Sequence, residues 1–204
     1  MRWISLFVIL VLLFAGSVNG QSRFSHPGGS HHSQEKKGSP ALILERGVND
    51  LIRFMRQSGA RDRQQLMEFV EKRVVPHFDF SHMAKLSTGR QWRRMGEKRR
   101  DRVVNRLKDE FLGVMVQRLS GYSGQGARVV GVRRTGEKEV AVAVMLENPQ
   151  GYPARLGFKL HRNDTGWKVF DVSANGSSAV MHYRQQFRQM LRSRRPQSRS
   201  TMNR

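Results

Sequence analysis

The sequence contains no cysteine, so disulfide bonds play no part in stabilising the fold. The composition is therefore compatible with an oxidising compartment, although the protein forms no disulfide bonds there. Because the anchoring of bacterial lipoproteins requires a cysteine after the leader segment, the same absence excludes a lipoprotein anchor.

Acidic residues are scarce: 16 Asp and Glu stand against 37 Lys and Arg, which gives a formal net charge of +21. This excess favours anionic partners, such as phospholipid headgroups, lipopolysaccharide, nucleic acid or an acidic protein surface. Solubility and a lineage bias toward arginine explain the same excess, so the charge alone does not assign a function.

The chain also has no apolar run long enough to cross a bilayer. The run from Trp3 to Ala15 falls short of the about 20 residues that a spanning helix needs. Arg2 precedes it, and Val18 and Gly20 offer compact residues at the cleavage positions. We therefore predict a secretory signal peptide over residues 1–20, with a retained membrane anchor as the alternative. Export speaks against an intracellular role on nucleic acid.

The remaining chain divides by composition into a tether, one domain and a tail. Residues 21–39 are rich in Gly, Ser, His and Lys, which is typical of a flexible tether. Histidines in such a segment rarely form a defined metal site, and we predict no bound metal. Residues 40–193 are the predicted domain, and residues 194–204 form a basic tail that we expect to fray.

The first half of the domain has helical periodicity. Ser39 and Pro40 form an N-cap followed by proline at the first helical position. Apolar residues recur at spacings of three and four, which predicts a series of helices. These begin at Pro40, at about Asp62, near Phe78 and at about Lys98, and the last one ends near Leu119.

Residues 127–173 change to a period of two. In residues 140–146 and 154–161, large apolar residues alternate with small or polar ones, and residues 129–132 and 167–172 are rich in β-branched and aromatic residues. Turn sequences separate these segments. The pattern predicts a four-stranded antiparallel meander, so the fold class is α+β.

A turn and an amphipathic helix follow the last strand. Asn175 and Gly176 suit the positive φ angles of a tight turn, and Ser177 or Ser178 can cap the helix. The apolar residues of this helix share one face: Val180, Tyr183, Phe187 and Leu191.

Three segments, residues 74–80, 86–95 and 166–187, resemble the MlaC-type periplasmic phospholipid-binding proteins, also called the toluene-tolerance auxiliary family. The resemblance covers residues 40–192 in the same order and with similar spacings. It departs in the His-rich tether, in the high arginine content, and at Ser87 and Thr88, where the family often has aliphatic residues.

The resemblance implies helices packed on a curved antiparallel sheet, distantly like nuclear-transport-factor-two domains, and a location in the periplasm. It implies a carrier that shuttles phospholipid between the outer and inner membranes and so maintains outer-membrane lipid asymmetry. The implied partners are phospholipid as cargo, an outer-membrane lipoprotein–porin complex, and an inner-membrane ABC transporter with an MCE-domain subunit. A monomer without cofactor, catalysis or nucleic-acid partner is expected.

A carrier of this kind needs a dry slot, because a 16-carbon acyl chain exposed to water costs roughly 12 kcal/mol. The long helix, the sheet and the last helix supply candidate wall residues. These are Phe111, Met115, Val142, Val144, Leu156, Phe158, Val169 and Tyr183. An ordinary filled core is the alternative for each of them. The small residues Ala141, Ala143 and Gly157 leave room only if their face of the sheet lines the slot.

Basic residues cluster between positions 90 and 108, where they form either a solvated helix face or a surface for headgroups or membranes. We predict headgroup or docking contacts for Arg93, Arg94, Arg99 and Arg184. Only Trp92 is interleaved with the clustered bases, whereas single-stranded nucleic acid would call for a series of stacking aromatics.

Two aspartates, Asp79 and Asp171, are the candidates for paired acid–base work, although such residues more often cap helices or turns. We predict no catalytic residue. The alternatives to a carrier are a secreted basic protein that binds polyanions and a small-pocket enzyme on a similar scaffold.

Overall fold

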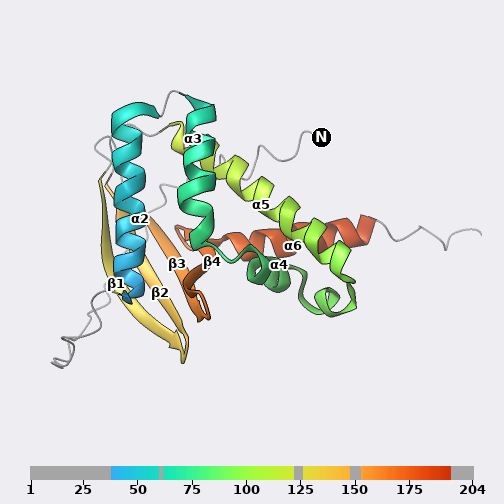
Figure 1. Ribbon diagram of the computed structural model, residues 1–204. Helices are drawn as coiled ribbons and strands as arrows, with labels where there is room; N and C mark the ends of the chain where they lie inside the picture. The colour runs from blue at the N-terminus through green and yellow to red at the C-terminus, as the bar shows by residue number, and fades with distance from the viewer. Residues whose placement is uncertain (1–37, 60–61, 122–125, 148–152, 194–204) are drawn as a thin grey trace, which may run out of the picture.

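The computed structural model describes residues 38–59, 62–121, 126–147 and 153–193 (Figure 1). The predicted signal peptide, the basic tail and nearly all of the predicted tether lie outside these residues. Within the described residues, no helix is both long and apolar enough to cross a membrane.

The first half of the described chain is helical, as predicted. The π-helical turn Met55–Gly59 extends the first helix, and Val70–Val74 extends the second in the same way. Two 3-10 turns, Val75–His77 and Gly89–Arg94, connect the later helices. The α-helices are α2 (Pro40–Phe54), α3 (Arg63–Phe69), α4 (Phe80–Thr88), α5 (Glu97–Leu119) and, at the end of the fold, α6 (Ala179–Ser193).

Side-chain caps explain where α3 and α4 begin. The Asp62 carboxylate accepts the N–H groups of Gln64 and Gln65 at the start of α3. Asp79 accepts the N–H of His82 in α4 at 2.8 Å. Ser39 precedes α2 as predicted, but its side chain makes no capping hydrogen bond.

The second half forms one antiparallel sheet in the order β1-β2-β3-β4-β5. The predicted four-stranded meander matches its first four strands, and β5 adds two residues that pair with the end of β4. Asn175 and Gly176 have φ angles of 48° and 89°, as the predicted turn requires. The strands are β1 (Ala127–Gly136), β2 (Glu139–Leu146), β3 (Ala154–Asn163), β4 (Gly166–Ala174) and β5 (Ser177–Ser178).

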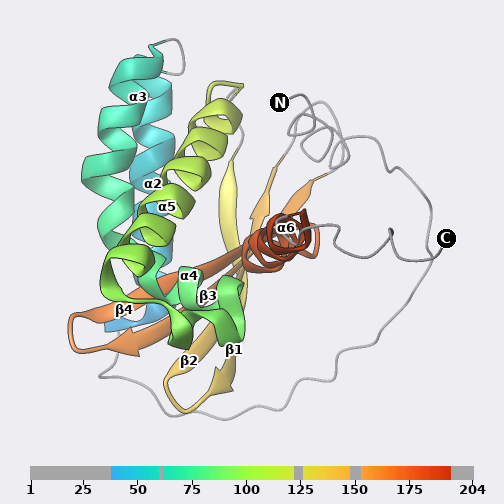
Figure 2. The ribbon, with the colours of Figure 1, turned by 90° about the vertical axis from the view of Figure 1, so that its right-hand side faces the viewer.

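Helices cover the sheet in two groups. Helix α2 runs along the β1–β2 side, and α3 lies beside it in the opposite direction (Figures 1 and 2). Helices α4 and α6 pack on each other near β4, and α5 contacts α3 and α4. The α+β prediction of helices packed on an antiparallel sheet is therefore confirmed.

This arrangement encloses two apolar clusters. The helical core consists mainly of residues from α3, α4 and α5, with Met55, Phe170 and Val180 from neighbouring elements. The sheet core lies between α2 and one face of the sheet. Its buried members are Leu44, Val140, Val142, Val144, Phe158, Leu160 and Val169.

Candidate functional site

One face of the sheet is apolar throughout the sheet core. Val142 pairs with Phe158, and Val144 pairs with Leu156, across β2 and β3. Val169 on β4 pairs with Leu160 and is buried with them. Because side chains alternate along a strand, these residues share the face that α2 covers.

The pairing also shows which residues share the buried face of the sheet. Ala141, Ala143 and Gly157 alternate with the buried valines and phenylalanine, so they lie on the opposite face. A Cβ atom added to Gly157 would lie 2.5 Å from the Ser173 hydroxyl, so this glycine accommodates its neighbour. These three small residues are not placed in the sheet core.

The eight predicted wall residues fall into two places. The sheet residues gather in the sheet core, whereas Phe111, Met115 and Tyr183 pack in the helical core. Phe78 and Val172 contact both clusters. Phe78 also packs against Phe111, with ring centroids 5.2 Å apart. Phe78 and Val172 therefore connect the two halves of the predicted wall.

Four further residues belong to the sheet core or pack against it without having been predicted as wall residues: Phe78, Val172, Leu44 and Val48. Phe78 lies in the family-like segment 74–80, and the two α2 residues belong to the first helical apolar stripe. These signals predict burial. They do not identify which of the buried side chains bring two separate clusters into contact.

A narrow crevice lies between α2 and the first two strands. Its volume is about 10 Å³, roughly the minimum that holds one water molecule. Most of its lining side chains are apolar. The residues that line the crevice are Glu45, Val48, Asn49, Ala127, Arg128, Val129 and Val144.

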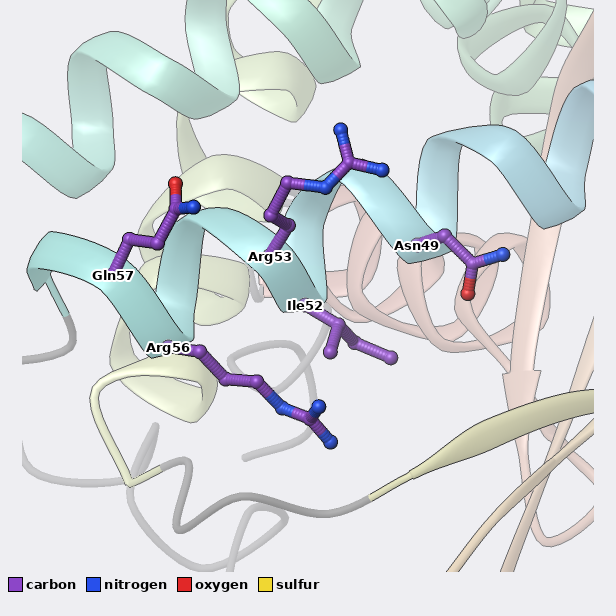
Figure 3. Close-up of a pocket in the computed structure, with 5 residues that line it drawn as sticks. All are labelled: Asn49, Ile52, Arg53, Arg56 and Gln57. Carbon is purple, nitrogen blue, oxygen red and sulfur yellow. The ribbon is translucent and has the colours of Figure 1, made fainter.

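A larger, open pocket lies along the surface at the end of α2 (Figure 3). Its volume is about 330 Å³, and Asn49 lines both spaces. Within the described part of the chain, its lining residues come from α2 and the π-helical turn that continues it, and most of them are exposed. They are Asn49, Ile52, Arg53, Arg56 and Gln57.

Polar groups buried in the described residues lie outside the sheet core. Ser87 and Thr88 donate to the carbonyl oxygens of Met83 and Ala84, each at 2.8 Å. Both bonds are local to α4, so these two residues, which depart from the family pattern, are satisfied within their own helix.

Asp171 is the only acidic or basic residue buried in the described chain, with 3% of its surface exposed. It accepts hydrogen bonds from the Ser178 hydroxyl and from the N–H of Val180 at 3.1 Å. Lys159 lies 3.4 Å away from the same carboxylate. Asp171 therefore fixes the start of α6 against β4 and β3, which is a structural role.

Asp79 also has structural partners. In addition to capping α4, its Oδ2 lies 3.0 Å from His161 Nε2 on β3. The rings of His161 and His82 are 4.5 Å apart. Burial, followed by the charge of His161, lowers the pKa of His82. Asp79 and Asp171 thus serve different helix starts and do not form a carboxylate pair.

Tyr183 is partly buried and packs against the helical core. Burial, and then the nearby charge of Glu110, raises the pKa of its hydroxyl. The side chain is therefore neutral near pH 7. Within the described residues, no group of three or more His, Cys, Asp or Glu residues is placed to hold a metal ion.

The predicted docking arginines differ in their surroundings. Arg93, Arg94 and Arg99 are exposed at the start of α5 and in the turn before it. Arg184 is half-buried, and its guanidinium is hydrogen-bonded to the carbonyl oxygen of Leu86. The docking role of all four residues stays a prediction, but only the first three present free surface.

The sequence model of the MlaC protein family matches residues 45–201. A solved structure of a phospholipid-binding protein from Ralstonia solanacearum, in complex with a phospholipid, is similar to this chain, with a TM-score of 0.67 and 20% identity. The match covers 76% of this chain and 88% of that one. At this identity the likeness shows the fold. No curated protein matches the chain.

Proposed function

Because the chain belongs to the MlaC family, we propose that it is a periplasmic carrier that binds phospholipid acyl chains and shuttles the lipid between the outer and inner membranes. The carried chains lie between α2 and the apolar face of the sheet. This is a binding role, and phospholipid is cargo rather than a cofactor.

The sheet core is the observation that carries this proposal. Valine, leucine and phenylalanine side chains fill one face of three strands, and none of the three polar residues that are buried in the described part of the chain lies among them. Such a surface can replace water around an acyl chain, at about 0.8 kcal/mol for each CH₂ group. An enzyme would need an acid or base there instead. The solved Ralstonia protein of similar fold holds a phospholipid.

Entry of a chain requires α2 and the sheet to move apart. The crevice of about 10 Å³ accepts no acyl chain as it stands. Phe78 and Val172, which touch both cores, are the side chains that a longer chain would meet next. We therefore propose that the lipid passes from the sheet core toward Phe111, Met115 and Tyr183.

The proposed route includes two membrane partners. They are an outer-membrane lipoprotein–porin complex and an inner-membrane ABC transporter with an MCE-domain subunit, and transfer between them maintains lipid asymmetry. The protein acts as a monomer after removal of residues 1–20. Exposed Arg93, Arg94 and Arg99 provide a cationic surface for docking.

Lipid analysis of natively purified protein tests the proposal. The protein is exported with its own leader, purified without detergent, and examined by native mass spectrometry and by solvent extraction. We expect phospholipid at close to one equivalent. A natively purified protein with no lipid, which also fails to take up phospholipid from vesicles, would contradict the carrier function.

A further inference from the structure

The outer edge of β1 is open among the residues that the structure describes. This strand is the first in the order β1-β2-β3-β4-β5, and within the described chain its only partner strand is β2 (Figure 1). A strand in this position presents unpaired N–H and C=O groups, which can accept a further strand. All residues from 130 to 136 are exposed, so no described element covers this part of the edge.

Two valines on this edge expose much of their surface. The exposed fractions are 52% for Val132 and 39% for Val130. Val132 pairs with Val142, a member of the sheet core, so Val132 lies on the face of the sheet that α2 covers. An added strand with an apolar side chain at this position would remove Val132 from water, which favours its binding.

The charged residues of β1 all have the same sign. The strand carries Arg128, Arg133 and Arg134 and no acidic residue. Arg128 lies 3.7 Å from Glu147, whereas Arg133 and Arg134 are exposed and form no ion pair with the described residues. The turn and the start of β2 that follow carry both signs: Glu137, Lys138 and Glu139.

This charge distribution selects between possible occupants of the edge. A second copy of the chain would bring arginines of one β1 beside arginines of the other, and like charges on neighbouring strands are destabilising. A strand with acidic side chains would instead gain opposite-charge pairs across the edge. The complementary occupant is therefore an acidic segment of another protein.

The same strand forms one side of the narrow crevice under α2. Val129 lines the crevice from β1, and Val48 lines it from α2. A strand added to β1 would therefore lie beside the place where α2 and the sheet have to move apart for an acyl chain to enter.

We infer that the edge of β1 binds an extended acidic segment of a protein that exchanges lipid with this carrier. The segment pairs with β1 as an added strand, with acidic side chains beside Arg133 and apolar side chains beside Val132. The inference rests on the proposed carrier function, and it assigns to β1 a docking site that is separate from the arginines of α5.

A plainer alternative is that this edge is only protected against pairing. The register with β2 shifts at Val130 and at Thr135, and such bulges, like charged side chains, commonly protect edge strands. Between the two shifts, however, residues 131–134 pair without interruption with residues 140–143, which leaves a regular stretch of strand. The two roles differ in whether β1 binds an acidic strand in solution.

The test uses the lipid-loaded protein, purified after export, in NMR titrations with peptides of about ten residues up to millimolar concentration. The probe alternates Val and Glu. One control peptide alternates Val and Lys, and the other is the Val–Glu peptide with proline at its central valines, which cannot donate the pairing hydrogen bonds. We expect only the Val–Glu peptide to shift the amide signals of β1 and to slow their hydrogen exchange.

Charge reversal in the protein tests the same pairing from the other side. Arg133→Glu combined with Arg134→Glu should weaken binding of the Val–Glu peptide about tenfold, because favourable cross-strand pairs become like-charge pairs. Arg162→Glu, which changes an exposed arginine of β3 away from this edge, is the matched control and should leave binding nearly unchanged. The spectra of the free variants show that they are folded before affinities are compared.

Other results overturn the inference. A β1 whose signals respond to no peptide is a protected edge. An equal response to the Val–Glu and Val–Lys peptides, or equal affinity of the double variant and the wild type, shows that the arginines do not select the strand. Signals of β1 that shift when the protein alone is diluted show that a second copy occupies the edge.

Phospholipid content, measured on the same samples, separates this test from the test of the carrier function. A protein that contains lipid but does not bind the Val–Glu peptide contradicts the strand site alone. A protein that binds the peptide at β1 but contains and takes up no lipid supports the strand site and contradicts the carrier function.

Discussion

Arg184 in α6 holds the carbonyl oxygen of Leu86 in α4 through two hydrogen bonds, 3.1 Å from Nε and 2.7 Å from Nη2. The Ser87 hydroxyl lies 3.5 Å from the carbonyl oxygen of Val180 and adds a weaker link between the same two helices. The last helix of the fold is therefore attached to α4 by a charged side chain as well as by apolar packing.

We expect Arg184→Gln to lower the free energy of unfolding by about 1.5–3 kcal/mol, because a charge-assisted pair of hydrogen bonds to a half-buried carbonyl is lost. Arg188→Gln, an exposed arginine one turn later, should change it by less than about 0.5 kcal/mol. Urea denaturation measures both. Equal stability of the two variants would show that the Leu86 contact contributes nothing.

His82 makes the stability of the fold depend on pH. Burial and the charge of His161 lower its pKa below 6.5, and they outweigh Asp79 and Glu139, which raise it, while Lys85 lowers it further. Below about pH 6.5 the unfolded chain then binds more protons than the folded chain. The free energy of unfolding should therefore fall as the pH falls through this range.

Urea denaturation at pH 7.5 and 5.5 measures this loss. His82→Gln removes one titrating group, so the difference between the two pH values should become smaller than in the wild type. The pKa of His77 is lowered as well, first by burial and then by Lys168 and Arg73, so part of the dependence should remain. An unchanged difference in His82→Gln would contradict the assignment.

The fold was largely predictable because period and turn chemistry act locally. Alternation in residues 140–146, the Asn175–Gly176 turn and the Ser178 cap each depend on neighbours in sequence. The site was less predictable. The position of Phe78 between two cores depends on its bridge to Val169, which comes from a distant strand.

The tertiary contacts of long side chains are equally hard to predict from the sequence. Arg184 resembles other surface arginines in sequence, and only packing of α6 against α4 brings its guanidinium to Leu86. Sequence periodicity predicts which face of a helix or strand is buried, but it does not predict which other element packs against that face.

A charged side chain introduced into the sheet core should reduce the amount of bound lipid. We expect Val144→Glu and Phe158→Glu to reduce bound phospholipid strongly, because a carboxylate without a partner is costly to bury. Val132→Glu is the matched control, since Val132 lies on the edge strand with 52% of its surface exposed. Mass spectrometry after solvent extraction measures lipid per protein.

A buried carboxylate without a partner also lowers the free energy of unfolding, by about 3–5 kcal/mol. Circular dichroism must therefore show folded protein before the lipid content is compared. Folded Val144→Glu and Phe158→Glu that retain the wild-type lipid content would rule out the sheet core as the wall.

The arginines at the start of α5 should govern docking without affecting the cargo. Replacement of Arg93, Arg94 and Arg99 by Glu is expected to slow lipid transfer to anionic liposomes about tenfold or more, because each base near an anionic surface contributes about 1 kcal/mol. Lipid bound per protein should stay the same. A fluorescence transfer assay provides the rate. The control reverses three exposed arginines of the other helical elements: Arg46, Arg63 and Arg73.

The dependence of the transfer rate on salt concentration tests the role of the same arginines independently. Attraction between exposed charges is screened within about 8 Å at physiological ionic strength, so the wild-type transfer rate should fall as salt rises. The Arg93, Arg94 and Arg99 variant should respond less to salt, because the attraction it has lost is the part that salt screens. A lipid-transfer rate that changes with neither salt nor charge reversal would show that these arginines are a solvated surface with no part in docking.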